Sequence, residues 1–147
     1  MEKADLSHHI LSRFNADLER VRTNVLQMGG LVEEQLANAV QALVNGDTAA
    51  ADRVVSNDPR VNAMEVSIDE DCNRILATRS PAASDLRLIV AVIKTITDLE
   101  RIGDEAEKIG YIGSRLAAME RPLDRYREIK HLGHAVEQML HHALDAF

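Results

Sequence analysis

Apolar residues recur at steps of three and four along most of this chain, which is the spacing of amphipathic helices. The first run extends from residue 11 to about residue 45, where Gly46 and Asp47 are typical of a helix end followed by a new N-cap. Gly29 and Gly30 interrupt this run, and the long seams on either side predict a bend or a close helix contact rather than a break. The seam comprises Phe14, Leu18, Val21, Val25, Met28, Val32, Leu36, Ala39 and Leu43.

A second apolar seam follows two helix-start signals. We expect a short helix over 47–55, and Asp58-Pro59 then repeats the cap-plus-proline start of a helix that runs to about residue 78. Two acids, Glu65 and Asp69, lie four residues apart on the flank of this helix, on neighbouring turns. Its seam is Val61, Met64, Ile68, Cys72 and Ile75.

The longest uninterrupted pattern, Ser80 to Leu116, predicts one helix that lies antiparallel to its predecessor. Ser80 is a suitable N-cap, and Pro81 falls at the first helical position. One line along this helix is apolar in its first half and acidic in its second: Leu86, Ile89, Ile93 and Ile96, then Glu100, Asp104 and Glu107. A second line is apolar throughout: Leu88, Val92, Leu99, Ala106 and Ile109.

Pro122 marks another break, and a last helical pattern extends from about Leu123 to Phe147. Its apolar side comprises Tyr126, Ile129, Leu132, Val136, Met139, Leu140, Ala143 and Phe147. The pattern continues to the last residue without a C-cap, which suggests a truncated domain. The expected fold is all-α, without strands: an antiparallel three-helix bundle over residues 1–120 and an additional C-terminal helix over 121–147.

Composition and charge narrow the class of protein. The 147 residues are 46% hydrophobic and 3% aromatic, without Trp, so aliphatic side chains must fill the core, which suits helix packing. The formal charge of −7 argues against a nucleic-acid partner. A single cysteine, Cys72, fits a small buried residue in a reducing compartment. Neither a signal peptide nor a spanning run is present, so the sequence predicts a cytoplasmic protein without direct membrane insertion.

Paired carboxylates are the most specific candidate chemistry. Glu100 and Asp104 are one turn apart, and convergent carboxylates bind hard cations, or iron and manganese. Gly103 between them leaves room for a backbone or a metal-bound water, and an adjacent antiparallel helix would bring Glu65 and Asp69 towards them. On the spacing alone, the alternative is a solvated face with i,i+4 ion pairs, such as Asp104 with Lys108.

Other polar residues give weaker signals. Glu128 and His131 match one Glu-x-x-His element of a di-iron bundle, but such a site needs two, so we expect surface residues. The remaining histidines of this segment are also expected to be surface residues: His134, His141 and His142. Asp85 lies in the first turn of its helix, where an acid stabilises the dipole. No phosphate-binding loop or activated nucleophile is present, and we do not expect an enzyme.

The run Ser80–Arg87, together with Asp98–Asp104, resembles the signature of the PhoU family, the accessory proteins of the bacterial phosphate-specific transporter. Asn62, Glu65, Ile68 and Asp69 and the opening 14–30 fit the same pattern. The resemblance implies a cytoplasmic negative regulator of the phosphate-starvation response and of phosphate uptake. It also implies two partners, the ATPase subunit of the transporter and a membrane sensor histidine kinase.

The resemblance further implies metal binding through Glu/Asp-x-x-x-Asp motifs, with iron, zinc, magnesium or manganese as the ion. Glu100 and Asp104 match this motif, and Glu65 and Asp69 repeat its spacing. Signature residues with a partner-binding or structural role are Asp85, Arg87 and Arg101, the last free to pair with a neighbouring helix or with a partner.

This chain departs from the family in length, because PhoU proteins have two similar three-helix bundles. Residues 1–120 match one bundle, and residues 121–147 match the first helix of a truncated second one. Large apolar side chains on that last helix have no bundle of their own, so we expect it to pack on a second copy, as a homodimer. Two alternatives are a ferritin-like di-iron bundle and a purely structural helical module.

Overall fold

The computed structural model describes residues 2–79, 81–119 and 126–147, with side chains from residue 12 onward. These residues form helices α1 (Glu2–Asn45), α2 (Thr48–Arg79), α3 (Ala83–Ala117) and α4 (Arg127–Asp145), and none of them lies in a strand. The all-α prediction is therefore confirmed. No helix among the residues described combines the length and the apolar composition needed to cross a bilayer.

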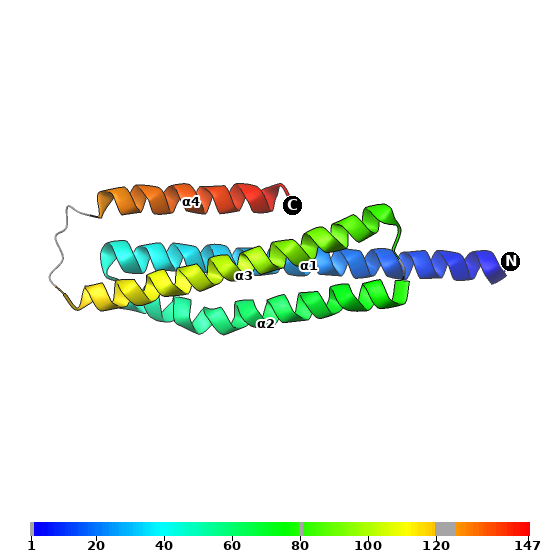
Figure 1. Ribbon diagram of the computed structural model, residues 1–147, viewed down its shortest axis with the longest axis horizontal. Coiled ribbons are helices and arrows are strands. Elements are labelled where there is room, and N and C mark those ends of the chain that lie inside the picture. The colour runs from blue at the N-terminus through cyan, green and yellow to red at the C-terminus, as the bar shows by residue number, and fades with distance from the viewer. Residues whose placement is uncertain (1, 80, 120–125) are drawn as a thin grey trace.

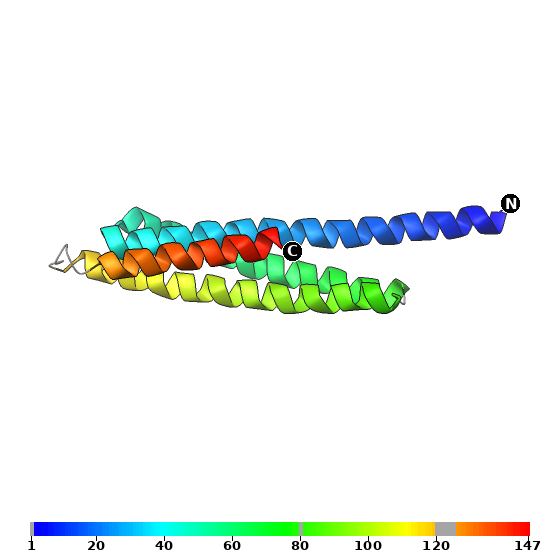
Figure 2. The same ribbon diagram turned by 90° about the horizontal axis from the view of Figure 1, so that it is seen from above.

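Helices α1, α2 and α3 form an antiparallel bundle in which each packs on the other two (Figure 1). The N-terminal part of α1 extends beyond the ends of α2 and α3 (Figure 2). The predicted seams supply the core, which is aliphatic and includes Val25, Met28 and Val32 of α1, Val61, Ile68 and Ile75 of α2, and Ile89, Val92 and Ile96 of α3. Burial of these side chains is the main stabilising contribution to the bundle.

The core-facing line of α3 runs between the two lines expected from the sequence. Its buried positions follow a strict three–four repeat: Ile89, Val92, Ile96, Leu99, Gly103, Ala106, Gly110 and Gly113. Leu86 and Leu88, by contrast, are exposed. Small residues in the second half let the helices approach closely: a Cβ on Gly113 would lie 2.8 Å from the backbone carbonyl carbon of Ala42.

Helix α2 corrects the prediction of two separate helices, because it is continuous and contains Pro59 in its interior. A proline costs one backbone hydrogen bond there. Buried neighbours on both sides, Val54 and Val61, hold the segment against the bundle, so packing prevails over local preference. The start at Asp47 is confirmed, since its Oδ1 accepts a hydrogen bond from the Ala50 N–H (3.0 Å).

The start of α3 also differs from the prediction. The helix begins at Ala83 with Ala82 as its N-cap, so Pro81 precedes the helix and no side chain caps it. Ser80 and Pro122 lie outside the described residues. The end of α1 is as predicted, because Gly46 has a φ of 70°, a left-handed conformation that favours glycine after a helix.

Helix α4 lies along α1 in both views (Figures 1 and 2). Leu144 packs over Gly29, where a Cβ would lie 2.5 Å from a Leu144 methyl, and Val40 packs over Gly133. The predicted close helix contact at Gly29 is confirmed. The helix that was expected to have no bundle of its own therefore packs on α1 of the same chain, because Gly29 of α1 and Gly133 of α4 each make room for a side chain of the other helix.

Candidate functional site

A buried polar cluster lies at the junction of α1, α2 and α3. Asp58 is 8% exposed and accepts two side-chain hydrogen bonds, from Gln35 Nε2 (3.1 Å) and from Asn62 Nδ2 (3.2 Å). Gln35 is fully buried, and its Nε2 also donates to the Gly103 carbonyl (3.3 Å). Because Gly103 lacks a side chain, it leaves room beside the amide of Gln35, 3.4 Å from the position of a Cβ. One carboxylate therefore connects α2 to α1 beneath the acidic half of α3.

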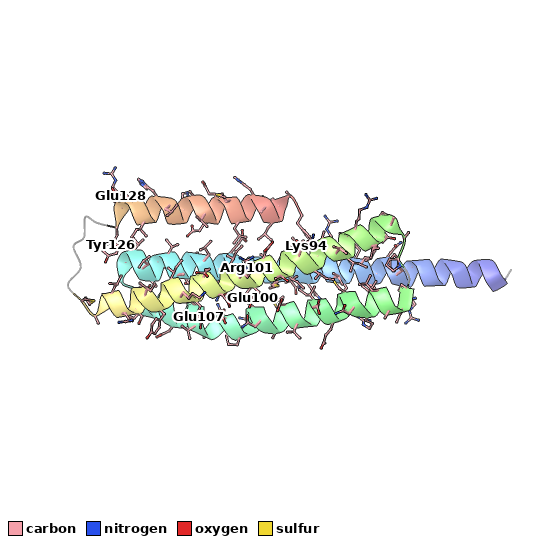
Figure 3. All side chains as sticks on the ribbon, viewed as in Figure 1. Lys94, Glu100, Arg101, Glu107, Tyr126 and Glu128 are labelled. Atoms are coloured by element: carbon pink, nitrogen blue, oxygen red, sulfur yellow. The ribbon has the colours of Figure 1, made fainter. Side chains whose placement is uncertain are left out.

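Three acids of α3, Glu100, Asp104 and Glu107, are partly buried on the side towards α2. Figure 3 shows Glu100 and Glu107 on this side of the helix. Among the residues that the structure describes, none donates a hydrogen bond to these carboxylates or forms an ion pair with them. Their charge is only partly compensated: the positive charge of Arg101 lowers the pKa of Glu100, and that of Lys108 lowers the pKa of Glu107, but neither outweighs the causes that raise these values.

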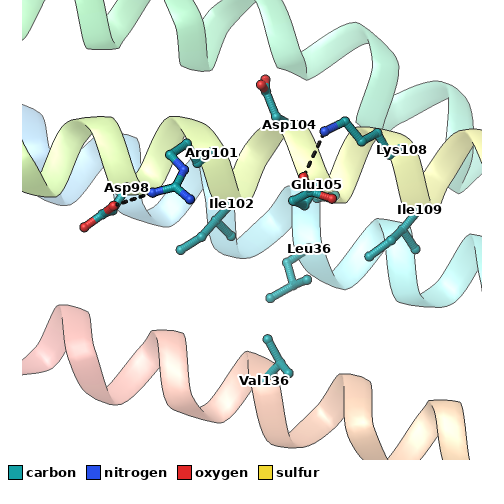
Figure 4. A pocket seen from close by; sticks show the side chains of 10 residues that line it. Leu36, Asp98, Arg101, Ile102, Asp104, Glu105, Lys108, Ile109 and Val136 are labelled. Atoms are coloured by element: carbon teal, nitrogen blue, oxygen red, sulfur yellow. Dashed lines mark hydrogen bonds and ion pairs between the residues drawn. The ribbon is translucent and has the colours of Figure 1, made fainter.

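The cations of α3 are engaged elsewhere on the helix. Arg101 pairs with Asp98 (3.4 Å) and Lys108 with Glu105 (2.8 Å), all four side chains being strongly exposed. The expected pair of Asp104 with Lys108 is therefore replaced by a pair three residues apart. In Figure 4 the Asp104 carboxylate points away from these two ion pairs. The cations thus leave the acids facing α2 without partners.

The surroundings of these acids raise two pKa values. The pKa of Glu100 is raised by burial, and then by the negative charges of Asp104, Glu65 and Asp58. The pKa of Glu107 is raised by burial, and then by Asp58 and Asp104. In both cases burial is the largest cause and neighbouring carboxylates add to it, a combination that favours protonation or a bound cation.

The four residues predicted to bind metal are only partly brought together. Glu65 of α2 is close enough to Glu100 to raise its pKa, and Asp104 lies one turn from Glu100. Asp69 instead accepts a hydrogen bond from Asn73 of its own helix (2.9 Å). Within the described ranges, no three His, Cys, Asp or Glu side chains are placed to hold a metal ion. The donor chemistry suits a hard cation, but the side chains would have to move to coordinate one.

The other predicted site residues are exposed or partly exposed, and the two arginines among them interact within their own helix. Asp85 is in the first turn of α3, as expected, and Arg87 donates to the carbonyl of Ala83 (3.3 Å) in that turn. Arg101 pairs with Asp98 of its own helix (3.4 Å). Their contacts within the described chain indicate local roles at the helix surface.

Sequence reasoning missed two residues of the cluster, Gln35 and Asp58. Gln35 precedes the seam residue Leu36, and Asp58 was interpreted only as a helix cap. The spacing of α2 contained the signal, since Asp58 and Glu65 alternate with Val54, Val61 and Ile68 at steps of three and four. An acid at a seam position is a stronger indication of a special environment than an acid pair.

Most of the remaining predictions for individual residues are confirmed. Cys72 is buried, and burial, with Asp69 and Asp71, raises its pKa to about 11, which excludes a reactive thiolate at neutral pH. Glu128 and His131 are exposed, so they form no inward-facing di-iron element. His141, however, is more than a solvated side chain: its Nδ1 lies 2.9 Å from Glu33 Oε1 on α1.

A groove lies between α3 and α4, and Leu36 of α1 forms its floor (Figure 4). Its volume is about 670 Å³. Ile102 and Ile109 of α3 and Val136 of α4 form its walls, and the two ion pairs of α3 lie along its rim. The groove exists because α4 packs on α1 without packing on α3.

Comparison with known proteins identifies the family. Residues 25–112 match the PhoU domain. The chain is 49% identical over its full length to the phosphate-specific transport system accessory protein PhoU homolog of Pseudomonas aeruginosa, and 48% identical over 148 aligned positions to PhoU of Escherichia coli K12. It covers 61% of each of these relatives. A crystal structure of PhoU from Pseudomonas aeruginosa superposes with a TM-score of 0.88 at 50% identity, covering 91% of this chain and 64% of that one. The chain belongs to the PhoU family.

Proposed function

We propose that this chain acts in the cytoplasm as a negative regulator of phosphate uptake and of the phosphate-starvation response. The proposal is supported by its similarity to accessory proteins of the phosphate-specific transport system, of which it spans about three fifths. The observation that carries the mechanism is the unpaired acidic face of α3. A rigid bundle with a charged surface that has no ion-pair partners among the described residues is suited to recognition of a partner rather than to catalysis.

The acidic face would bind a divalent or iron-type cation: iron, zinc, magnesium or manganese. Glu100 and Asp104 supply one pair of carboxylates, and Glu65 supplies another across the α2–α3 junction. Asp69 would join after releasing Asn73. A bound cation would relieve the repulsion that raises the pKa of Glu100, and it would offer a positive centre to an acidic group of a partner.

The partners would be the ATPase subunit of the phosphate transporter and the sensor histidine kinase of the phosphate regulon, between which this protein is an adaptor. The decisive experiment is capture of each purified partner with and without chelator. We expect wild type to bind both, and Glu100→Gln with Asp104→Asn to lose the chelator-sensitive part of the binding. The matched control is Asp98→Asn with Glu105→Gln, whose acids are already paired with Arg101 and Lys108. This variant should capture both partners as wild type does.

A homodimer is part of the same proposal. On α4, Leu132 (65% exposed) and Met139 (70% exposed) continue a stripe that α1 does not cover. Pairing with a second copy would remove this apolar area from water. Sedimentation at high micromolar concentration tests the dimer. A wild-type mass equal to that of the monomer, unchanged in Leu132→Glu, would contradict it.

A further inference from the structure

A shallow groove opens between α2 and α3 on the surface next to the acidic face. It has a volume of about 560 Å³ and is lined by Val55, Glu107, Lys108, Tyr111 and Ile112, which we call the Tyr111 groove. Val55 is 46%, Tyr111 60% and Ile112 49% exposed. It shares none of the four residues to which metal binding is assigned above, and of the residues that line the α3–α4 groove it shares Lys108.

The apolar side chains of the Tyr111 groove are not needed for the core. Each has a buried neighbour that does the packing: Val54 beside Val55, and Gly110 and Gly113 on either side of Tyr111 and Ile112. Tyr111 also supports the guanidinium of Arg115, 5.9 Å from its ring centre. Adjacent large apolar side chains that the fold leaves in water are typical of a protein-binding surface.

The charge on the rim indicates what kind of segment fits. Glu107 borders the groove, and Asp104 and Asp58 are close enough to act on its carboxylate. The cation on this rim, Lys108, is held by Glu105. Arg115 adds a positive charge over Tyr111, and a ligand that places apolar side chains on Tyr111 and Ile112 meets negative charge at the Glu107 edge, towards α2.

We propose that the Tyr111 groove docks an amphipathic helical segment of a partner protein, one that carries large apolar residues flanked by Lys or Arg. This inference rests on the proposed function, because it assumes that the protein works by contact with partners. The apolar side chains would cover Val55, Tyr111 and Ile112, and a basic residue of the segment would pair with Glu107. A groove of about 560 Å³ suits the apolar side chains of one or two turns of a helix, as in helix-in-groove recognition.

The test uses a fluorescent helical peptide of Leu and Lys at amphipathic spacing, and the same peptide with Glu in place of Lys, on the full chain without divalent metal. We expect the Leu/Lys peptide alone to bind. Tyr111→Ala with Ile112→Ala should weaken binding at least tenfold. Glu107→Gln should weaken it several-fold and reduce its dependence on salt, since one ion pair is lost. Circular dichroism checks that each variant remains folded.

Matched controls replace exposed apolar residues elsewhere: Val66→Ala on α2 and Val90→Ala on α3. Both should bind the peptide as wild type does. Binding that survives the Tyr111 and Ile112 changes, or that is lost in Val90→Ala, would overturn the proposal. Concentration-dependent self-association abolished by Tyr111→Ala would overturn it too, by assigning the groove to a second copy. If one of these results overturns the inference while the wild type and the Tyr111 and Ile112 variants still capture the transporter ATPase, the proposed function stands and this inference alone fails.

Discussion

Asp58 is a carboxylate in the interior of a helical bundle, and its hydrogen bonds explain why it is tolerated there. Gln35 and Asn62 each donate to one of its oxygens, so α1 and α2 together satisfy the buried charge. The other oxygens of these amides, Gln35 Oε1 and Asn62 Oδ1, are buried without a partner in the described structure. The cluster fixes how α1 and α2 are aligned.

Replacing Gln35 with Leu tests this role. The change leaves one Asp58 oxygen and the Gly103 carbonyl without their donor, so we expect a loss of about 1–3 kcal/mol in the free energy of unfolding. Urea denaturation measures it. The double variant with Asp58→Leu should recover part of the loss, because the unsatisfied charge is removed as well. An unchanged free energy of unfolding in Gln35→Leu would contradict this role for Gln35.

The raised pKa values of Glu100 and Glu107 make a prediction about pH. Because the folded pKa lies above the ordinary value, stability present below the ordinary pKa of Glu is lost as the pH rises through the folded pKa. We therefore expect Glu100→Gln with Glu107→Gln to melt at a higher temperature than wild type at pH 7, and the difference to shrink towards pH 4. Thermal denaturation by circular dichroism measures both.

The matched control for that prediction is Asp98→Asn, whose acid is exposed and paired with Arg101. It should not stabilise the protein at pH 7. If Asp98→Asn raised the melting temperature at pH 7 by the same amount, the cause would be overall net charge and not the acidic face.

At the scale of the helix, the glycines of α3 are packing residues. A Cβ on Gly113 would lie 2.8 Å from the backbone of α1, which cannot yield as a flexible side chain would. Gly113→Ala should therefore cost about 1–3 kcal/mol by overpacking, measured by urea denaturation. Gly30→Ala is the matched control, because nothing lies within 4 Å of its Cβ. It should stabilise α1 by about 0.5–1 kcal/mol through helix propensity. The reverse order would refute the close approach of α1 and α3.

The attachment of α4 should depend on pH through His141. Hydrogen bonding to Glu33 raises the pKa of His141, and the charges of Asp145 and Glu33 add to the shift. The stabilising contribution is present below the ordinary pKa of His and is lost as the pH rises through the folded pKa. We expect amide exchange in α4 to be slower at pH 5.5 than at pH 8, after correction for intrinsic rates.

In His141→Gln that pH difference should disappear, because glutamine can keep a hydrogen bond to Glu33 but cannot take up a proton. His131→Gln, at an exposed position of the same helix, should behave as wild type does. An unchanged pH difference in His141→Gln would show that another group controls the docking of α4.

The sequence predicted the helices better than their ends. Apolar periodicity identified the seams of α1 and α2 and the extent of α3, because burial imposes that spacing. Local signals at Pro59 and Pro81 misplaced two helix starts, since packing around Val54 and Val61 holds α2 together across the proline. For the site, the acidic change along α3 was visible, but Asp58 and Gln35 become a pair only when α1 and α2 meet.

At the scale of the molecule, a three-helix bundle carries α4 on one side and an unpaired acidic face between α2 and α3 (Figures 1 and 3). Helix α4 packs on α1, whereas the acidic face lies towards α2, and Asp104 of that face also lines the groove between α3 and α4. Sequence alone did not show that α4 packs along α1, because that contact depends on small residues, Gly29 and Gly133, facing Leu144 and Val40.

We propose that a cation completes the acidic face of α3, and a titration with Mn²⁺ that follows the melting temperature measures whether it binds there. A ligand that binds only the folded state raises the melting temperature with concentration. We predict a rise in wild type and in Asp98→Asn with Glu105→Gln, and none in Glu100→Gln with Asp104→Asn. The same rise in melting temperature in all three proteins would contradict a cation site at Glu100 and Asp104. So would the absence of a rise in all three with Mn²⁺, iron, zinc and magnesium.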